Sequence, residues 1–82
     1  MVYVNLHFVD YIKRKEEKRM QLRAWRRAKD ISQQEMADRL NVHVGTYQNW
    51  EKNPQKISID HAKKISEILG VSINDISFTE GS

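Results

Sequence analysis

The chain has 82 residues, of which 39% are hydrophobic, and a formal net charge of +3. This length and apolar content suffice for one domain around one small core, without room for a catalytic cavity. The absence of cysteine excludes disulfides and thiolate metal sites, and no apolar run is long enough to span a membrane. Because Asn5, His7 and Asp10 interrupt the first apolar stretch, it does not resemble a signal peptide, and we expect a cytoplasmic protein.

The positive charge is concentrated in residues 11–29, which hold nine of the 14 Lys and Arg residues against two acidic ones. These nine are Lys13, Arg14, Lys15, Lys18, Arg19, Arg23, Arg26, Arg27 and Lys29. Residues 30–82 hold five basic and eight acidic side chains, so the rest of the chain is mildly acidic. Clustered positive charge is typical of phosphate binding, but a solvated helix face has the same composition. Charge alone therefore leaves both explanations open.

Residues 2–9, with the sequence V-Y-V-N-L-H-F-V, predict a short strand. The alternating positions are Val2, Val4, Leu6 and Phe8. A lone strand is not stable in water and needs a partner. It would either pair with the same strand of a second subunit or form a loose arm.

After this stretch the chain becomes helical in character. Residues 10–18 are polar and charged, and we expect them to be helical or frayed. The first helix of the core is predicted over about residues 20–29, with Leu22, Trp25 and Ala28 on its inner face. This helix carries part of the basic cluster on its other faces.

The next helix is predicted over residues 33–40 and has signals at both ends. Ser32 caps its start, and Glu35, three residues later, is placed to complete a capping box. One face is apolar, through Met36, Ala37 and Leu40. Asn41 tolerates the left-handed conformation of a sharp helix stop, and Val42 follows as a buried anchor.

A third helix is predicted over residues 44–52, with Tyr47 and Trp50 on its inner face. Pro54 ends it, because proline disfavours helical geometry at the preceding residue. Two helices that cross at a wide angle need a small residue at the crossing, and Ala37 provides one. This pattern of two short helices and a four-residue turn is a helix-turn-helix signature, and it makes DNA binding the leading hypothesis.

The remaining chain completes a small helical domain. Ser58 caps a helix that stops at Gly70, and its predicted inner face consists of Ile59, Ala62, Ile65, Ile68 and Leu69. Ser72 caps a last short turn that contains Ile73 and Ile76, and residues 77–82 are expected to fray. We therefore divide the chain into an N-terminal extension (1–19), a DNA-binding domain (20–78) and a tail (79–82).

Three segments resemble one known family: L-R-A-W-R-R-A-K-D-I-S-Q-Q-E-M-A-D-R-L-N-V, T-Y-Q-N-W-E-K-N and A-K-K-I-S-E-I-L-G-V-S-I-N-D-I. They are similar to the phage repressor and Cro (Xre-type) helix-turn-helix family over residues 20–76. The resemblance implies an all-α, five-helix, lambda-repressor-like domain that acts as a sequence-specific transcriptional regulator of phage or prophage origin. Its partner would be double-stranded DNA with a palindromic or pseudo-palindromic operator, bound by a homodimer without a cofactor or small-molecule ligand.

Carried over residue by residue, the resemblance implies two sets of DNA contacts. Base edges would be contacted by Val44, Gly45, Thr46, Gln48 and Asn49. Phosphates would be contacted by Gln33, Arg23, Arg26, Lys52 and Lys56. Arg26 and Glu51 match an ion pair of the family, with the guanidinium also free to touch a phosphate. The amides of Gln48 and Asn49 can donate and accept together, as the N6/N7 edge of adenine requires.

The chain also departs from the family pattern. His43 stands where the family has a Ser or Thr cap, so we expect a weaker cap. Gly45 lowers helix propensity by about 1 kcal/mol relative to Ala. The helix over residues 44–52 has no Lys or Arg before Lys52, so it has no arginine to contact a guanine in the groove. Recognition would therefore rest on amides, methyl groups and DNA shape. Affinity would then depend on Arg23, Arg26, Arg27 and the 13–19 cluster.

Each of these residues also has a structural explanation. Trp25, Tyr47 and Trp50 have the helical spacing of core residues, and we expect the Tyr47 hydroxyl at the surface. Gln48 and Asn49 could be ordinary surface amides. The three histidines share no metal-ligand spacing, and no serine has a base beside it, so we expect neither a metal site nor an enzyme. The alternative function is a protein-interaction module, such as an antitoxin or a partner-binding regulator.

Residues 1–19 lie outside the resemblance and have two explanations. Small phage regulators often begin just before their first helix, and the codons available for Lys15-Glu16-Glu17 can spell a purine-rich ribosome-binding sequence. The native start would then be Met20, and residues 1–19 would be a misassigned extension. Alternatively, residues 2–9 are a dimerising strand and residues 13–19 a basic arm.

Overall fold

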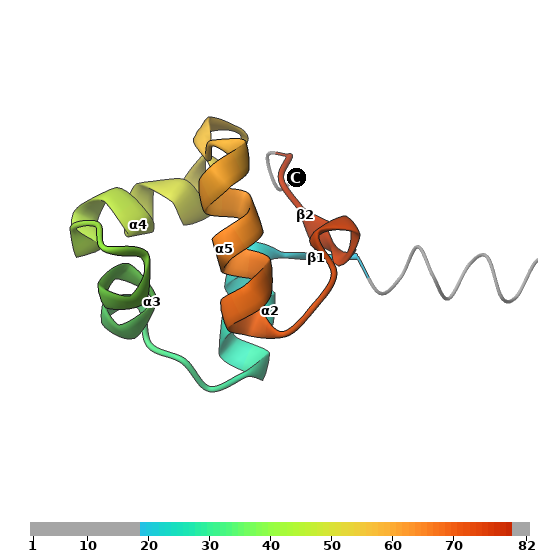
Figure 1. Cartoon of the computed structure of the whole chain (residues 1–82), viewed down its shortest axis with the longest axis horizontal. Helices are drawn as coiled ribbons and strands as arrows, with labels where there is room; N and C mark the ends of the chain where they lie inside the picture. Colours follow the sequence, from blue (N-terminus) through green and yellow to red (C-terminus); the bar gives the residue numbers. More distant parts are fainter. Residues whose placement is uncertain (1–18, 80–82) are drawn as a thin grey trace, which may run out of the picture.

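Four α-helices follow one another in the computed structural model, which describes residues 19–79 (Figure 1). They are α2 (Leu22–Ala28), α3 (Gln33–Leu40), α4 (Val44–Lys52) and α5 (Ile59–Leu69). Two 3-10 turns, η1 (Pro54–Lys56) and η2 (Ile73–Asp75), follow α4 and α5. The predicted fifth helix is thus a 3-10 turn in this structure. The predicted strand over residues 2–9 lies outside the described residues.

A two-stranded parallel sheet joins the two ends of the domain. Strand β1 (Met20–Gln21) pairs with β2 (Ile76–Ser77), with Met20 opposite Ile76 and Gln21 opposite Ser77. The prediction that the first helix starts at residue 20 is therefore wrong by two residues. The ladder partner lies more than 50 residues away, beyond the reach of any local helix signal.

Side-chain bonds hold the C-terminal segment against α2. The indole Nε1–H of Trp25 donates to the carbonyl of Asp75 at 2.8 Å. Just before β1, the Nε–H of Arg19 donates to the carbonyl of Asn74 at 3.3 Å. These bonds satisfy backbone carbonyls of η2, which have no helical partner, and keep the two strands together.

Local capping signals set the ends of the two central helices. The Ser32 hydroxyl accepts a hydrogen bond from the N–H of Glu35 at 3.0 Å, as predicted. The Glu35 carboxylate, however, pairs with Arg39 one turn later, so only half of the predicted capping box forms. Asn41 has a φ of 58° and ends α3 in the left-handed conformation. At α4, the His43 side chain makes no capping bond, in line with the expected weak cap.

Capping signals also set both ends of α5. The hydroxyl of Ser58 accepts a bond from the N–H of His61 at 3.2 Å, and Gly70 ends the helix with a φ of 68°. The left-handed backbone conformation costs glycine little free energy, because glycine has no Cβ. Among the described residues 19–79, no helix is long and apolar enough to cross a membrane.

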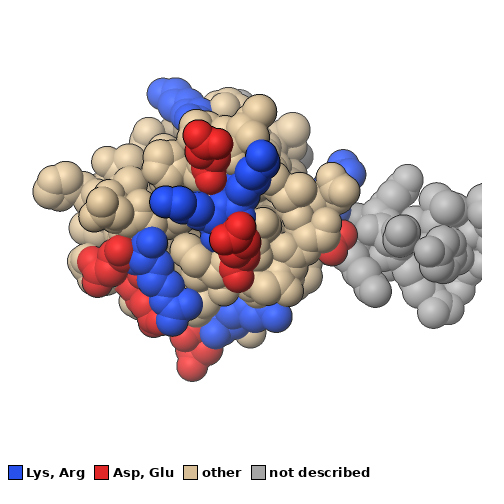
Figure 2. Space-filling model, in the orientation of Figure 1, with Lys and Arg blue, Asp and Glu red and all other residues tan. Residues whose placement is uncertain are grey.

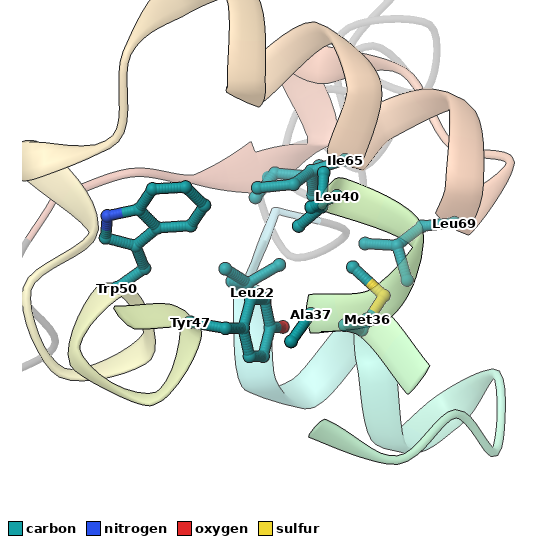
Figure 3. Close-up of a cluster of buried hydrophobic side chains, with 9 residues drawn as sticks. Leu22, Met36, Ala37, Leu40, Tyr47, Trp50, Ile65 and Leu69 are labelled. Atoms are coloured by element: carbon teal, nitrogen blue, oxygen red, sulfur yellow. The ribbon is translucent and has the colours of Figure 1, made fainter. Parts of the chain in front are cut away.

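The core lies where the four helices meet (Figure 3). Its buried members are Leu22, Met36, Ala37, Leu40, Tyr47, Trp50, Ile65, Leu69 and Ile76. Ala37 is 0% exposed, consistent with a small residue at the contact between α3 and α4. Val42 is only half-buried and packs against this cluster.

Two residues of the predicted inner faces lie outside the core. Ile59 is 72% exposed, because it stands in the first turn of α5, beyond the helices that cover the rest of that face. Ala28 is exposed at the end of α2, and Arg26 is buried there instead, at 8% exposure. A buried arginine needs a partner, and the partner comes from α4.

Candidate nucleic-acid interface

The two sides of α4 differ in burial. Tyr47 and Trp50 face the core, at 0% and 9% exposure. Gly45, Thr46, Gln48 and Asn49 are exposed, and Val44 is half-buried. Because a helix repeats every 3.6 residues, burial of positions 47 and 50 turns the intervening positions to solvent. The structure therefore brings the predicted base contacts together on one helix, whereas their contact with bases stays a prediction.

Gly45 lies in an open part of this surface. Apart from its chain neighbours and the backbone of its own helix, a Cβ atom built there would meet no atom of the described residues within 4 Å. The helix thus has no internal packing need for glycine at this position. A small residue in the first turn leaves the α4 backbone free to approach a partner closely.

A buried ion pair links α2 to the end of α4. The Nε–H of Arg26 donates to Oε2 of Glu51 at 2.6 Å, and a terminal nitrogen donates to Oε1 at 3.3 Å. The other terminal nitrogen donates to the carbonyl of Ile31 at 2.9 Å. The two charged side chains are only 9% and 4% exposed. All three nitrogens of the guanidinium are therefore engaged inside the protein.

The predicted ion pair of Arg26 with Glu51 is present, whereas its predicted contact with a phosphate stays a prediction. The guanidinium has five N–H groups, and the three bonds inside the protein leave two of them for a partner outside. Within the protein, Arg26 holds Glu51, and through it Gln33 at the start of α3.

Two glutamines extend this ion pair to the surface. The Nε2–H of Gln33, the first residue of α3, donates to Oε1 of Glu51 at 2.9 Å. The Nε2–H of Gln48, on the exposed face of α4, donates to Oε1 of Gln33 at 3.1 Å. A continuous chain of bonds thus runs from the buried Arg26 to an exposed amide. Sequence spacing contains no signal for the Gln33–Gln48 contact, because the two residues lie on different helices.

The bonds around Glu51 keep it charged. Burial on its own would raise the pKa of the Glu51 carboxyl, but hydrogen bonds from Arg26 and Gln33, together with the nearby Tyr47 hydroxyl, hold this pKa below its usual value. The hydrogen bond to Glu51 in turn raises the pKa of Arg26. The pair therefore stays ionised at neutral pH.

Tyr47 corrects another expectation. Its hydroxyl was predicted at the surface, but the side chain is 0% exposed, and within residues 19–79 the hydroxyl oxygen makes no hydrogen bond, although it faces the Arg26–Glu51 pair. Burial raises the pKa of this phenol far above its usual value. The tight crossing of α3 and α4 encloses the whole ring, and the hydroxyl is enclosed with it.

A basic hollow opens beside this chain of bonds. We use this name for the concave surface lined by Gln21, Arg23, Arg27, Gln33, Gln48, Glu51 and Lys52. Three cations line it, whereas its acidic member, Glu51, is neutralised by Arg26. In contrast, the face that α5 crosses in Figure 1 shows Lys and Arg beside Asp and Glu (Figure 2). The hollow is therefore suited to an anion.

The hollow contains some predicted phosphate contacts and not others. Gln33, Arg23 and Lys52 line it together. Lys56 is exposed at the end of η1 and is not part of its lining. Gln21 joins it although sequence reasoning placed that residue inside a helix. Its position depends on the β1–β2 pairing, for which the sequence has no local signal.

Comparison with known proteins gives one match. A family model described as helix-turn-helix matches residues 22–76, which cover α2 through the first residue of β2. No curated protein and no solved structure matches the chain.

Proposed function

This chain belongs to the helix-turn-helix family of the Xre, Cro and lambda-repressor type, and we propose that it regulates transcription by placing α4 in the major groove of an operator. The family is one of DNA-binding regulators, which supports the general part of the proposal. We also propose that the protein binds one DNA sequence specifically, that it does so as a dimer, and that it is a regulator of the phage Cro type.

The exposed face of α4 carries the proposal. The major groove of B-DNA is about 12 Å wide and admits an α-helix. Gln48 and Asn49 offer amides to base edges, and the methyl groups of Val44 and Thr46 suit the thymine methyl. No Lys or Arg precedes Lys52 on α4. Recognition would therefore rest on amides, methyl groups and the shape of the DNA.

The basic hollow is the proposed phosphate site beside the groove. Arg23, Arg27 and Lys52 supply positive charge, and Gln33 stands at the start of α3. The free N–H groups of a helix start favour an anion. With a phosphate in the hollow, α3 lies on the DNA backbone while α4 enters the groove.

We propose that two copies bind one operator. A single α4 contacts few base pairs, so one domain would bind weakly. Two-fold related copies on half-sites about 34 Å apart, one helical turn, would combine two such contacts. A palindromic or pseudo-palindromic operator follows from that symmetry.

Selection of bound fragments from random DNA tests the proposal directly. A specific regulator enriches one site, and its affinity falls steeply with salt because each phosphate contact adds about −0.9 to the slope of log K against log salt. Lys52→Ala should weaken all sites and make that slope shallower by about 1. Lys64→Ala on the exposed side of α5 is the matched control and should leave the slope unchanged.

Variants of α4 test the base contacts. Gln48→Ala and Asn49→Ala should reduce discrimination between the selected site and altered sites, while Gln33→Ala should weaken every site. If no site is enriched, or if neither α4 variant changes discrimination, the proposal is refuted.

A further inference from the structure

The fold gives no reason for a glycine at position 45. Gly45 is the second residue of α4, and of the glycines within residues 19–79 only Gly70 has a positive φ, so alanine would fit the backbone at position 45. A Cβ there would touch nothing within residues 19–79 beyond its chain neighbours and its own helix. Alanine would also favour the helix, since glycine has one of the lowest helix propensities. Gly45 therefore weakens α4 without serving its packing.

The residues around Gly45 leave the first turn of α4 without a long outward side chain. Val44 is half-buried and packs against the core cluster, and Tyr47 is fully buried. Among the first four residues of α4, Thr46 is thus the only one with an exposed side chain. The long amide of Gln48 follows in the next turn. The backbone at Gly45 is therefore open to close approach by a partner.

Building on the proposed function, we propose that Gly45 leaves room for the C5-methyl group of a thymine. In the major groove, thymine presents this methyl group beside its O4 acceptor, and cytosine lacks it. At the bare Cα of Gly45, the methyl carbon would be in van der Waals contact at about 3.5–4.0 Å. Val44 and Thr46, the chain neighbours, add methyl groups of their own to this part of the helix. Gly45 thus recognises thymine through the side chain that it lacks.

A side chain at position 45 would separate the helix from the base. A Cβ would stand about 1.5 Å from its Cα, in the place of the thymine methyl. A gap of about 0.5–1 Å already loses about a quarter to a half of a van der Waals contact. Gln48 and Asn49 lie on the same helix, so their bonds to base edges would lengthen as well. A methyl group added to the protein should therefore weaken binding more than a methyl group removed from the DNA.

Uracil tests the inference, because it differs from thymine only by the missing C5-methyl group. Each thymine of the selected site is replaced by uracil in turn, and binding is measured for wild type and for Gly45→Ala. At one thymine of a half-site, uracil should weaken wild-type binding about fourfold, the effect of one buried methyl group. Gly45→Ala should bind the thymine site about tenfold more weakly than wild type does and should prefer uracil at that position. The other thymines are the internal controls and should respond alike in both proteins.

Thermal denaturation shows whether the loss of binding arises at the interface. Gly45→Ala should raise Tm by about 2–6 °C, because alanine favours a helix. Gly45→Ser adds a Cβ with a smaller gain in helix propensity. It should therefore weaken binding as Gly45→Ala does, while raising Tm less. A lower Tm in Gly45→Ala would show that the fold needs this glycine, and would overturn the inference.

The remaining outcomes separate this inference from the proposed function. Enrichment of no DNA site refutes the proposed function and this inference with it. With a site enriched, equal binding by wild type and Gly45→Ala refutes the inference alone. A loss in Gly45→Ala that uracil relieves at no position also refutes it, because no thymine methyl would then lie at Gly45.

Discussion

Replacing Glu51 with alanine should destabilise the protein severely, because it leaves the Arg26 guanidinium buried without its counter-charge. The two side chains are 9% and 4% exposed, and their closest atoms are 2.6 Å apart. Removing one partner of such a buried pair costs about 3–5 kcal/mol. A chain of 82 residues has a total free energy of unfolding of roughly 4–12 kcal/mol. Glu51→Ala should therefore lower Tm by roughly 12 °C or more.

Urea denaturation followed by circular dichroism measures the effect. The double variant Arg26→Met/Glu51→Leu removes both charges, so its free energy of unfolding should lie within about 1 kcal/mol of wild type or above it. Arg39→Ala breaks an ion pair whose side chains are 50% and 43% exposed, and should change stability by less than about 0.5 kcal/mol. A loss below about 1 kcal/mol in Glu51→Ala would refute the reasoning. So would a double variant that is as unstable as the two single variants added together.

Three further predictions concern stability. Tyr47→Phe removes a buried hydroxyl that makes no hydrogen bond to the part of the chain that the structure describes. It should therefore be neutral or stabilise the fold by up to about 1 kcal/mol, and a clear loss in urea denaturation would show that the hydroxyl is bonded. His43→Ser should supply the side-chain cap that α4 lacks and raise stability by about 1 kcal/mol, which thermal denaturation can measure against wild type. The folded pKa of Glu51 lies below its usual value of 4.5, so ionised Glu51 should stabilise the fold fully above pH 4.5 and lose this effect as pH falls through the folded pKa. In Glu51→Gln, the free energy of unfolding should therefore change less with pH on the acid side.

Local signals in the sequence predicted much of the fold. The bounds of α3 and α4 agree with the expected ranges, because caps and stops act within one helical turn. Ser32, Asn41 and Ser58 needed only their immediate neighbours to be recognised. The burial of Tyr47 and Trp50 likewise followed from their spacing along one helix.

Resemblance to a family supplied the Arg26–Glu51 pair, but not the consequences of its burial. Sequence reasoning placed Ala28 on the inner face of the first helix and left Arg26 off that face. The structure shows the reverse arrangement, with Arg26 buried and Ala28 exposed. Which of two neighbouring positions on a short helix faces inward depends on what packs against it.

The chain's own residues thus determined where the helices of the helix-turn-helix unit begin and end, because those signals lie within four residues of each boundary. Only the tertiary structure decided that Met20 and Gln21 pair with a strand near the other end of the domain, and that Gln33 joins a buried carboxylate to Gln48. These contacts join residues that lie far apart in the chain or on different helices. Their geometry is set by how the elements pack together, which no local pattern records.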